Sequence, residues 1–340
     1  MNDKASQAGA LFIVHNSSFK QQNQSVKESY RKLCQSEPSI PIFSQDWWLD
    51  IVCGPQRWDA IILENNGRIK AAMPLYHPLA DVISMPAFTQ TMGPWFAPDS
   101  ADTKYTTRLS QRQAISQQLI ERLAPYRVFL QNFHHDITDW LPFYWAGFQQ
   151  TTRYTYLLEG IDQPELCWQQ MSANIRRNII KARDKQGLIL RKGIDTEAFL
   201  KIQDQTFARQ GLRLKQDKKI LRQLIATCRQ REQGDIWGAF DSQERLHAAA
   251  FVVWQPQSAY YLAGGGDPSL RSSGAHSWVM WEAIRYVSQF TDCFDFEGSM
   301  LPGVERFFRE FGAKQTPYFT ITKNKLSLLD RARIKINRWL

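Results

Sequence analysis

The stretch that decides the fold is YYLAGGGDPSLRSSGAHSWVMWEAIRYVSQFTDCFDFEGSMLPGVERFFREFGA, residues 260–313. Residues 259–263 are short, aromatic and apolar, which predicts a strand. Residues 264–266 are three glycines and predict a loop, because glycine tolerates positive φ and lets another molecule approach the backbone. Between residues 275 and 290, apolar and aromatic side chains recur at helical spacing. The expected order is therefore strand, glycine-rich loop and helix.

This loop is predicted to bind an anion. Arg271-Ser272-Ser273-Gly274 leads into the expected helix, whose first N–H groups and positive dipole end attract negative charge. The Arg271 guanidinium adds a fork of donors suited to phosphate. A tight strand-to-helix turn with a serine cap is the alternative. The residues predicted to hold phosphate are Gly264, Gly265, Gly266, Arg271, Ser272, Ser273 and Gly274.

Two carboxylates follow the expected helix. Alternation along residues 293–297 predicts a strand with Asp295 and Glu297 on one face, about 7 Å apart. Mutual repulsion and burial raise the pKa of such a pair, so Glu297 or Asp295 is a candidate base or acid. The alternative is that they cap a helix and pair with arginines such as Arg306. Tyr318, in a further expected strand, is a weaker candidate acid.

The whole chain has the composition of an ordinary globular protein. Its 340 residues suffice for two domains, and no apolar run approaches the about 18 residues that span a membrane. The five cysteines are dispersed, which predicts reduced thiols in a cytoplasm and neither a disulfide scaffold nor a zinc site. The run His134-His135-Asp136 is predicted to be structural, because neighbours on a strand point to opposite faces. No metal is expected.

Positive charge is concentrated in the middle of the chain. The net charge is +9, and residues 171–231 hold sixteen Lys and Arg against five Asp and Glu. Arg176, Arg177 and Lys181 lie on an expected helix, where Arg177 and Lys181 share a face at i, i+4. This excess predicts a polyanionic partner, such as nucleotide phosphates, RNA or an acidic membrane surface. A solvated basic face is the alternative.

Two stretches resemble each other. DAIILENNGRIKAAMPLY (59–76) and DIWGAFDSQERLHAAAFVV (235–253) both predict hairpins and align on Arg68 and Arg245. Either the chain has two tandem domains or the similarity is chance. We predict domains at 1–160 and 161–325, the first lacking a phosphate loop and forming the acceptor side of a groove. Residues 326–340 predict a basic amphipathic helix that packs on its own domain or lies on an anionic membrane. Its apolar stripe is Leu329, Ala332, Ile336 and Trp339.

With these pieces together, the chain resembles the GNAT acyltransferase superfamily, and more narrowly its FemAB-like branch. The resemblance rests on IRRNIIKARDKQGL (175–188), ERLHAAAFVVW (244–254), YYLAGGGDP (260–268), FDFEGS (294–299) and FFREFGA (307–313). It implies an α/β (α+β) fold of two tandem domains, each a mixed, mostly antiparallel twisted sheet flanked by helices. It also implies that strands 259–263 and 293–297 splay apart around a donor. His276 stands where the usual phosphate loop has a small residue.

The resemblance implies an N-acyltransferase that moves an acyl or aminoacyl group to an amine, FemAB-like and in cell-envelope or polysaccharide metabolism. The donor would be acyl-CoA or aminoacyl-tRNA, with backbone amides near Tyr261–Gly264 polarising its carbonyl and Glu297 or Asp295 accepting the proton. Arg176, Arg177 or Lys181 would hold phosphates of donor or acceptor. The expected location is cytoplasmic, peripheral to the inner membrane face. The alternative function is a non-catalytic protein of the same fold that binds RNA or anionic lipid.

Overall fold

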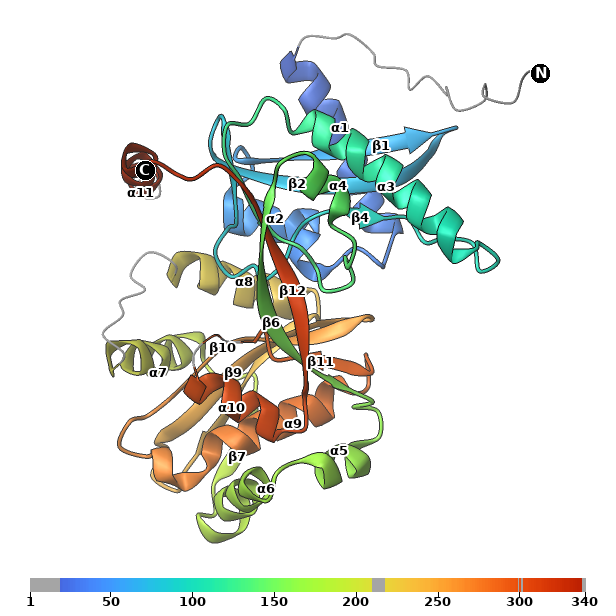
Figure 1. Cartoon of the computed structure of the whole chain (residues 1–340). Helices are drawn as coiled ribbons and strands as arrows, with labels where there is room; N and C mark the ends of the chain where they lie inside the picture. Colours follow the sequence, from blue (N-terminus) through green and yellow to red (C-terminus); the bar gives the residue numbers. More distant parts are fainter. Residues whose placement is uncertain (1–18, 210–217, 299, 301, 338–340) are drawn as a thin grey trace, which may run out of the picture.

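The computed structural model describes residues 19–209, 218–298, 300 and 302–337. It has two lobes joined by a long two-stranded ribbon (Figure 1). The N-terminal half contains, in order, α1 (Phe19–Ser36), a 3-10 turn (Ile42–Ser44), α2 (Asp46–Cys53), β1 (Trp58–Asn65), β2 (Arg68–Leu79), β3 (Val82–Ser84), β4 (Trp95–Phe96), α3 (Tyr105–Arg122), β5 (Phe129–Asn132), α4 (Leu141–Trp145) and β6 (Gln149–Glu159).

The C-terminal half contains the elements of the opening sequence. In order, these are α5 (Pro164–Gln170), α6 (Ala173–Ile180) with a π-helical turn (Lys181–Lys185), β7 (Ile189–Lys192), α7 (Thr196–Arg209), α8 (Lys218–Gln230), β8 (Gly234–Phe240), β9 (Leu246–Gln255), β10 (Ser258–Gly266), a 3-10 turn (Arg271–Ser273), α9 (Ala275–Val287), β11 (Cys293–Asp295), α10 (Pro302–Glu310), β12 (Lys314–Lys323) and α11 (Leu328–Asn337).

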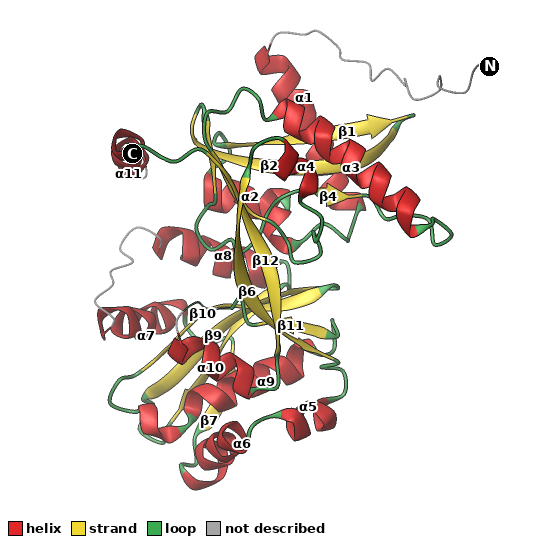
Figure 2. Cartoon of the chain, viewed as in Figure 1, coloured by secondary structure: helices red, strands yellow, loops and turns green. Residues whose placement is uncertain are grey.

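The two expected hairpins are present. β1 and β2 pair antiparallel around Asn66 and Gly67, whose positive φ angles of 52° and 71° suit the tight turn. β8 and β9 form the second hairpin. The predicted fold class is confirmed: helices flank two sheets whose strands pair mostly antiparallel (Figure 2).

The larger sheet runs through both lobes. Its strand order is β5-β12-β6-β11-β10-β9-β8-β7. β12 returns from the C-terminal half and pairs with β6 from Lys314↔Leu157 to Thr322↔Gln149, and then with β5. The ribbon β6–β12 in Figure 1 is therefore built from both halves of the sequence. A domain boundary near residue 160, directly after β6, stays a prediction.

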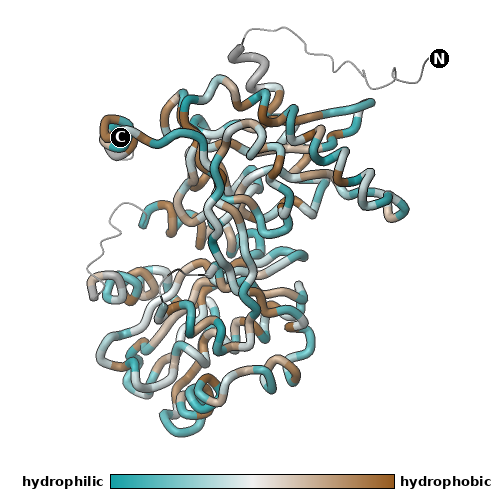
Figure 3. Tube along the Cα trace, in the orientation of Figure 1, coloured by the Kyte–Doolittle hydropathy of each residue, from teal (hydrophilic) through white to brown (hydrophobic). Residues whose placement is uncertain are grey.

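The two faces of the C-terminal sheet have separate cores. One face packs against α6, α9 and α10 and includes Ala259, Phe294 and Phe296. The other packs against α7, α8 and the N-terminal helices, and its Tyr260 ring lies 4.8 Å from the ring of Phe43. The brown segments of Figure 3 follow these buried strands and helices. This core, which residues of both halves share, fixes one lobe against the other.

The described part of the chain contains all five cysteines. All five cysteines are free thiols, as predicted. None of the described helices combines the length and apolar character that crossing a bilayer needs. In α11, Leu329 and Ala332 are exposed, so the expected packing of this stripe onto its own domain is wrong for these two residues. The side chains of Ile336 and Trp339 lie outside the described residues.

Candidate active site

β10 and β11 separate after a short parallel contact. They pair only at Ala259↔Phe294 and Tyr260↔Asp295. β10 then continues along β9 to Gly266, whereas β11 ends at Asp295. β10 therefore extends beyond its pairing with β11, which agrees with the splay expected from the family resemblance.

The three glycines lie in the strand, and the prediction that they form a loop is wrong. Gly264, Gly265 and Gly266 pair with Ala250, Ala249 and Ala248 of β9. Their small size serves packing: a Cβ on Gly265 would lie 2.9 Å from the Ile202 carbonyl oxygen, and one on Gly264 would lie 2.1 Å from the Tyr261 hydroxyl. The backbone of α7 therefore requires glycine at position 265, whereas a side chain at position 264 would displace the Tyr261 ring. Contact with a donor stays a prediction.

The Arg271–Gly274 segment leads into a helix N-terminus as expected. Residues 271–273 form the 3-10 turn, and Gly274, with φ of 81°, precedes α9. Ser273 Oγ accepts the Ala275 N–H at 3.3 Å, but the N-cap residue of α9 is Gly274, so the alternative of a serine N-cap is wrong. Arg271 and Ser272 are exposed. Their exposure next to a helix N-terminus is suited to a phosphate-bearing ligand.

His276 turns into the protein. Its Nε2 lies 3.3 Å from the Tyr261 hydroxyl, and its ring centroid lies 5.3 Å from that of Phe307. Burial lowers the pKa of His276 to about 4, which keeps it neutral at pH 7. The unusual residue in the loop is thus a packing partner of Tyr261 and Phe307.

The helix α6, which carries Arg176 and Arg177 and is followed by Lys181, approaches this loop. The Asn178 carbonyl oxygen of α6 would be 2.3 Å from a Cβ on Gly274, so α6 touches the start of α9. Among the described residues, Arg176, Arg177 and Lys181 have no carboxylate within 4.0 Å, in contrast to much of the basic segment. The paired cations are Arg183, Arg191, Lys192, Lys218, Arg222 and Arg229.

Asp295 is buried and bonded. It is 1% exposed, and burial raises its pKa. Its Oδ1 accepts hydrogen bonds from the Thr155 hydroxyl and from the Glu297 N–H. Gln90, from the N-terminal half, donates to Thr155 Oγ1 at 3.0 Å. Asp295 is therefore held by both halves of the chain.

Glu297 lies beyond the end of β11, so the expectation that it shares a strand face with Asp295 is wrong. Its φ of 58° is left-handed, which ends the alternation. Glu297 Oε1 is buried and has no hydrogen-bond partner among the described residues. Burial, and then the charge of Asp295, raise the pKa of Glu297 well above its ordinary value. Arg306 pairs with Glu310, so the alternative that it neutralises these carboxylates is also wrong.

Tyr318 belongs to the same surroundings. It lies opposite Arg153 in the β6–β12 ribbon, is 6% exposed and accepts a hydrogen bond from Arg153 Nε at 3.3 Å. Burial raises its pKa, and the charges of Glu297 and Asp295 raise it further. The three predicted catalytic residues are therefore close enough to influence one another's ionisation.

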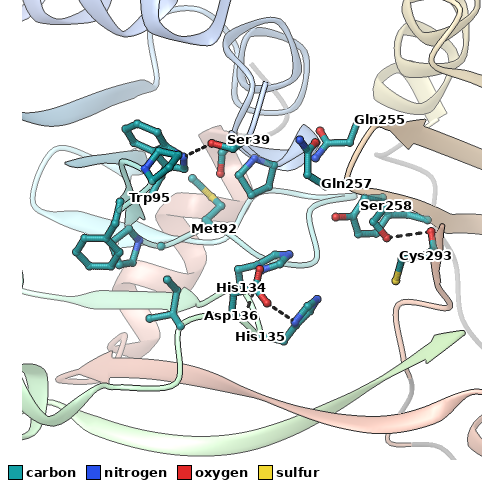
Figure 4. A pocket seen from close by; sticks show the side chains of 18 of the residues that line it. Ser39, Met92, Trp95, His134, His135, Asp136, Gln255, Gln257, Ser258 and Cys293 are labelled. Carbon is teal, nitrogen blue, oxygen red and sulfur yellow. Dashed lines mark hydrogen bonds and ion pairs between the residues drawn. The ribbon is translucent and has the colours of Figure 1, made fainter. Parts of the chain in front are cut away.

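The sequence interpretation missed a cavity of about 280 Å³ between the two halves (Figure 4). His134, His135 and Asp136 lie in a turn, and their side chains converge instead of pointing to opposite faces as expected. A histidine pair followed by aspartate was the available signal. The lining residues that matter here are Trp95, His134, His135, Asp136, Tyr260 and Cys293.

The chain is similar to one known protein family and to several solved structures. A family model described as an acetyltransferase (GNAT) domain matches residues 169–309. No curated protein matches the chain in sequence. A crystal structure of FemX superposes with a TM-score of 0.62 at 11% identity, covering 92% of this chain and 98% of that one.

Two further solved structures share the architecture. The C-terminal domain of a putative lysylphosphatidylglycerol synthetase from Agrobacterium fabrum has a TM-score of 0.54 at 12% identity, with coverages of 92% and 95%. A conserved protein of unknown function from Bacteroides thetaiotaomicron has a TM-score of 0.53 at 11% identity, with coverages of 88% and 97%. Residues 169–309 therefore match a GNAT acetyltransferase domain, and the two halves together share the fold of FemX.

Proposed function

We propose that this protein is an N-acyltransferase that moves an acyl or aminoacyl group from an activated donor to an amine. The observation that carries the proposal is Glu297, which follows the end of β11 and has a buried carboxyl oxygen without a hydrogen-bond partner among the described residues. A buried polar atom of this kind is costly unless a proton or ligand meets it.

The donor lies between the splayed strands in this proposal. Its phosphates meet the N-terminus of α9, Arg271 and the cations of α6, while backbone amides near Tyr261–Gly264 polarise the reacting carbonyl. Acyl-CoA and aminoacyl-tRNA are the two donor classes that carry such phosphates. The unpaired Arg176, Arg177 and Lys181 support either donor, and no metal takes part.

The acceptor amine attacks the carbonyl directly. It approaches from the face of the sheet opposite α9, where the cavity between the halves reaches Tyr260 and Cys293. Glu297 accepts a proton from the attacking nitrogen, supported by Asp295 and Tyr318. A cytoplasmic location peripheral to the inner membrane face, and an acceptor from the cell envelope or polysaccharide metabolism, are parts of the same proposal.

Two binding assays and one variant test the proposal. Calorimetry with CoA and filter binding with charged tRNA distinguish the donor classes. Glu297→Gln is then compared with the wild type in transfer assays with the donor that binds. Failure of both donors to bind, or an unchanged rate in Glu297→Gln, contradicts the proposed chemistry.

A second function, binding to anionic lipid without catalysis, is favoured by α11. Leu328 and Leu329 are 82% and 72% exposed, and the exposed Arg331 and Arg333 follow them. Apolar side chains next to cations suit the surface of an anionic membrane. Co-sedimentation with vesicles containing phosphatidylglycerol, with and without residues 326–340, tests this function. Pelleting that does not depend on the tail argues against it.

A further inference from the structure

The cavity between the halves contains a histidine–carboxylate pair. His135 Nδ1 lies 3.1 Å from Asp136 Oδ1, and both residues line the cavity (Figure 4). The Asp136 side chain is 76% exposed, while that of His135 is mostly covered. When Nδ1–H is held by a carboxylate, the lone pair of the imidazole is at Nε2. Among the described residues, His135 Nε2 has no hydrogen-bond partner.

His135 and Asp136 lie on the face of the sheet opposite α9, which the proposed function assigns to the acceptor. Tyr260 and Cys293 line the same cavity, and they flank Asp295 through the β10–β11 register. Ala259 and Phe294, which alternate with them, face α9 instead. The carboxylate of Asp295 also influences the ionisation of His135. The cavity thus meets the β10–β11 pair from the side opposite the helix assigned to the donor.

Amide formation requires more than one proton acceptor. An amine arrives as an ammonium at neutral pH, and its nitrogen loses two protons in becoming an amide. The C–N bond forms while the bond from the carbonyl carbon to the leaving sulfur or oxygen breaks. One proton is relayed by Glu297 to the leaving group. The other must leave before attack, because an ammonium has no lone pair, and it passes to solvent.

We propose that His135 Nε2 accepts this first proton from the acceptor's ammonium, while Asp136 orients the imidazole and attracts the cation. The inference rests on the proposed function and adds to it that the acceptor is a primary amine bound as its ammonium. His135 then returns the proton to water through the open side of the cavity.

The surrounding groups suit this role. Burial lowers the pKa of His135, but Asp136, Asp295 and Glu159 together raise it above its ordinary value of 6.5. The two histidines hold the pKa of Asp136 far below its usual range, so Asp136 stays ionised. The raised pKa makes His135 a stronger base than an ordinary histidine, which favours proton transfer from the acceptor's ammonium.

His134 makes different contacts. Its Nδ1 lies 3.3 Å from Asp136 Oδ2 and also accepts the backbone N–H of Asp136 at 3.3 Å. We assign the proton acceptor to His135, whose Nδ1 makes the shorter contact with the carboxylate, at 3.1 Å. The ring of His134 lies 4.1 Å from that of His135 and positions it. His134→Gln is therefore the matched control for His135→Gln.

The test compares two probe amines with the donor that binds. Ethanolamine is an ammonium at neutral pH, and hydroxylamine is largely neutral there. His135→Gln is expected to slow transfer to ethanolamine at least about tenfold and to leave transfer to hydroxylamine within about twofold. His134→Gln should lower both rates alike. Equal losses of both amines in His135→Gln overturn the proposal, as does abolition of wild-type transfer by EDTA, which would indicate a metal at this cluster.

A titration separates failure of this inference from failure of the proposed function. If no donor supports transfer, the proposed function fails. The interaction between His135 and Asp136 is then tested separately, by measuring the pKa of His135 with NMR of labelled histidine. The His135 pKa is expected above 6.5 in the wild type and lower in Asp136→Asn. Where transfer occurs, the rise of the rate with pH should move to lower pH in that variant. If the pKa of His135 does not fall in Asp136→Asn, the proposed interaction between His135 and Asp136 is contradicted.

Discussion

The Glu297 backbone N–H donates to Asp295 Oδ1 at 2.7 Å, so one short turn fixes two carboxyl groups in unlike surroundings. Asp295 accepts from Thr155 as well, whereas Glu297 Oε1 has no partner among the described residues. A carboxylate whose oxygen already accepts hydrogen bonds, such as Asp295, is suited to holding neighbouring groups in place. A buried carboxyl oxygen without them is suited to exchanging a proton with a ligand.

Replacing Glu297 by glutamine should therefore reduce catalysis without unfolding the protein. Glutamine has nearly the same shape but cannot accept a proton, so turnover should fall at least about tenfold. Steady-state kinetics with the donor that binds measure the effect. Glu244→Gln, on an exposed side chain paired with Arg191, is the control and should keep the wild-type rate. A similar fall in both variants would contradict a specific role for Glu297.

Glu297→Gln should also remove a loss of folding stability that the wild type shows as pH rises. Because the pKa of native Glu297 is raised above its ordinary 4.5, the unfolded chain releases this proton at lower pH than the native protein does. Between the two values the unfolded state binds fewer protons, and the free energy of unfolding falls as pH rises. Urea unfolding from about pH 4 to about pH 8 should show Glu297→Gln gaining on the wild type with rising pH. Parallel curves would contradict the raised pKa.

Local sequence patterns predicted the elements whose causes are local. Asn66-Gly67 supplies the turn of the first hairpin, and the spacing of apolar residues from 275 to 290 agrees with α9. The short β10–β11 pairing agrees with the splay expected from family resemblance. These features depend on nearby residues or on motifs already known to occur together, so sequence alone could indicate them.

The features that the sequence could not indicate depend on distant contacts. Gly265 is required by the Ile202 carbonyl of α7, which packs against the strand from far along the chain. The β6–β12 pairing joins residues about half the chain apart. His135 and Asp136 converge because the chain turns after β5, and this turn leaves them facing a cavity that both halves enclose.

The cations beside the loop should determine donor affinity. Arg271→Ala, and the double variant Arg177→Ala with Lys181→Ala, remove charges that have no carboxylate partner among the described residues, so both should weaken binding of the donor. Arg191→Ala is the control, since Glu244 already neutralises that charge. If charged tRNA binds, each lost phosphate contact should reduce the dependence of log Kd on log salt by up to about one unit. Unchanged affinity in both variants would place the phosphates elsewhere.

The contact between α6 and α9 should be sensitive to one methyl group. Gly274 has φ of 81°, and a Cβ there would lie 2.3 Å from the Asn178 carbonyl oxygen. Gly187 has φ of 58° with open space around it, so Gly187→Ala measures the backbone strain alone, about 1–2 kcal/mol. Gly274→Ala should cost a further about 1–3 kcal/mol because the helices must move apart.

Urea unfolding of the two glycine variants measures this difference, and donor binding gives a second readout. Moving α6 away from the start of α9 separates Arg177 and Lys181 from the Arg271–Gly274 loop. Gly274→Ala should therefore weaken donor binding, whereas Gly187→Ala should not. Equal losses of stability in the two variants would mean that the close approach of Asn178 is easily relieved, and that the loop and α6 do not act as one binding surface.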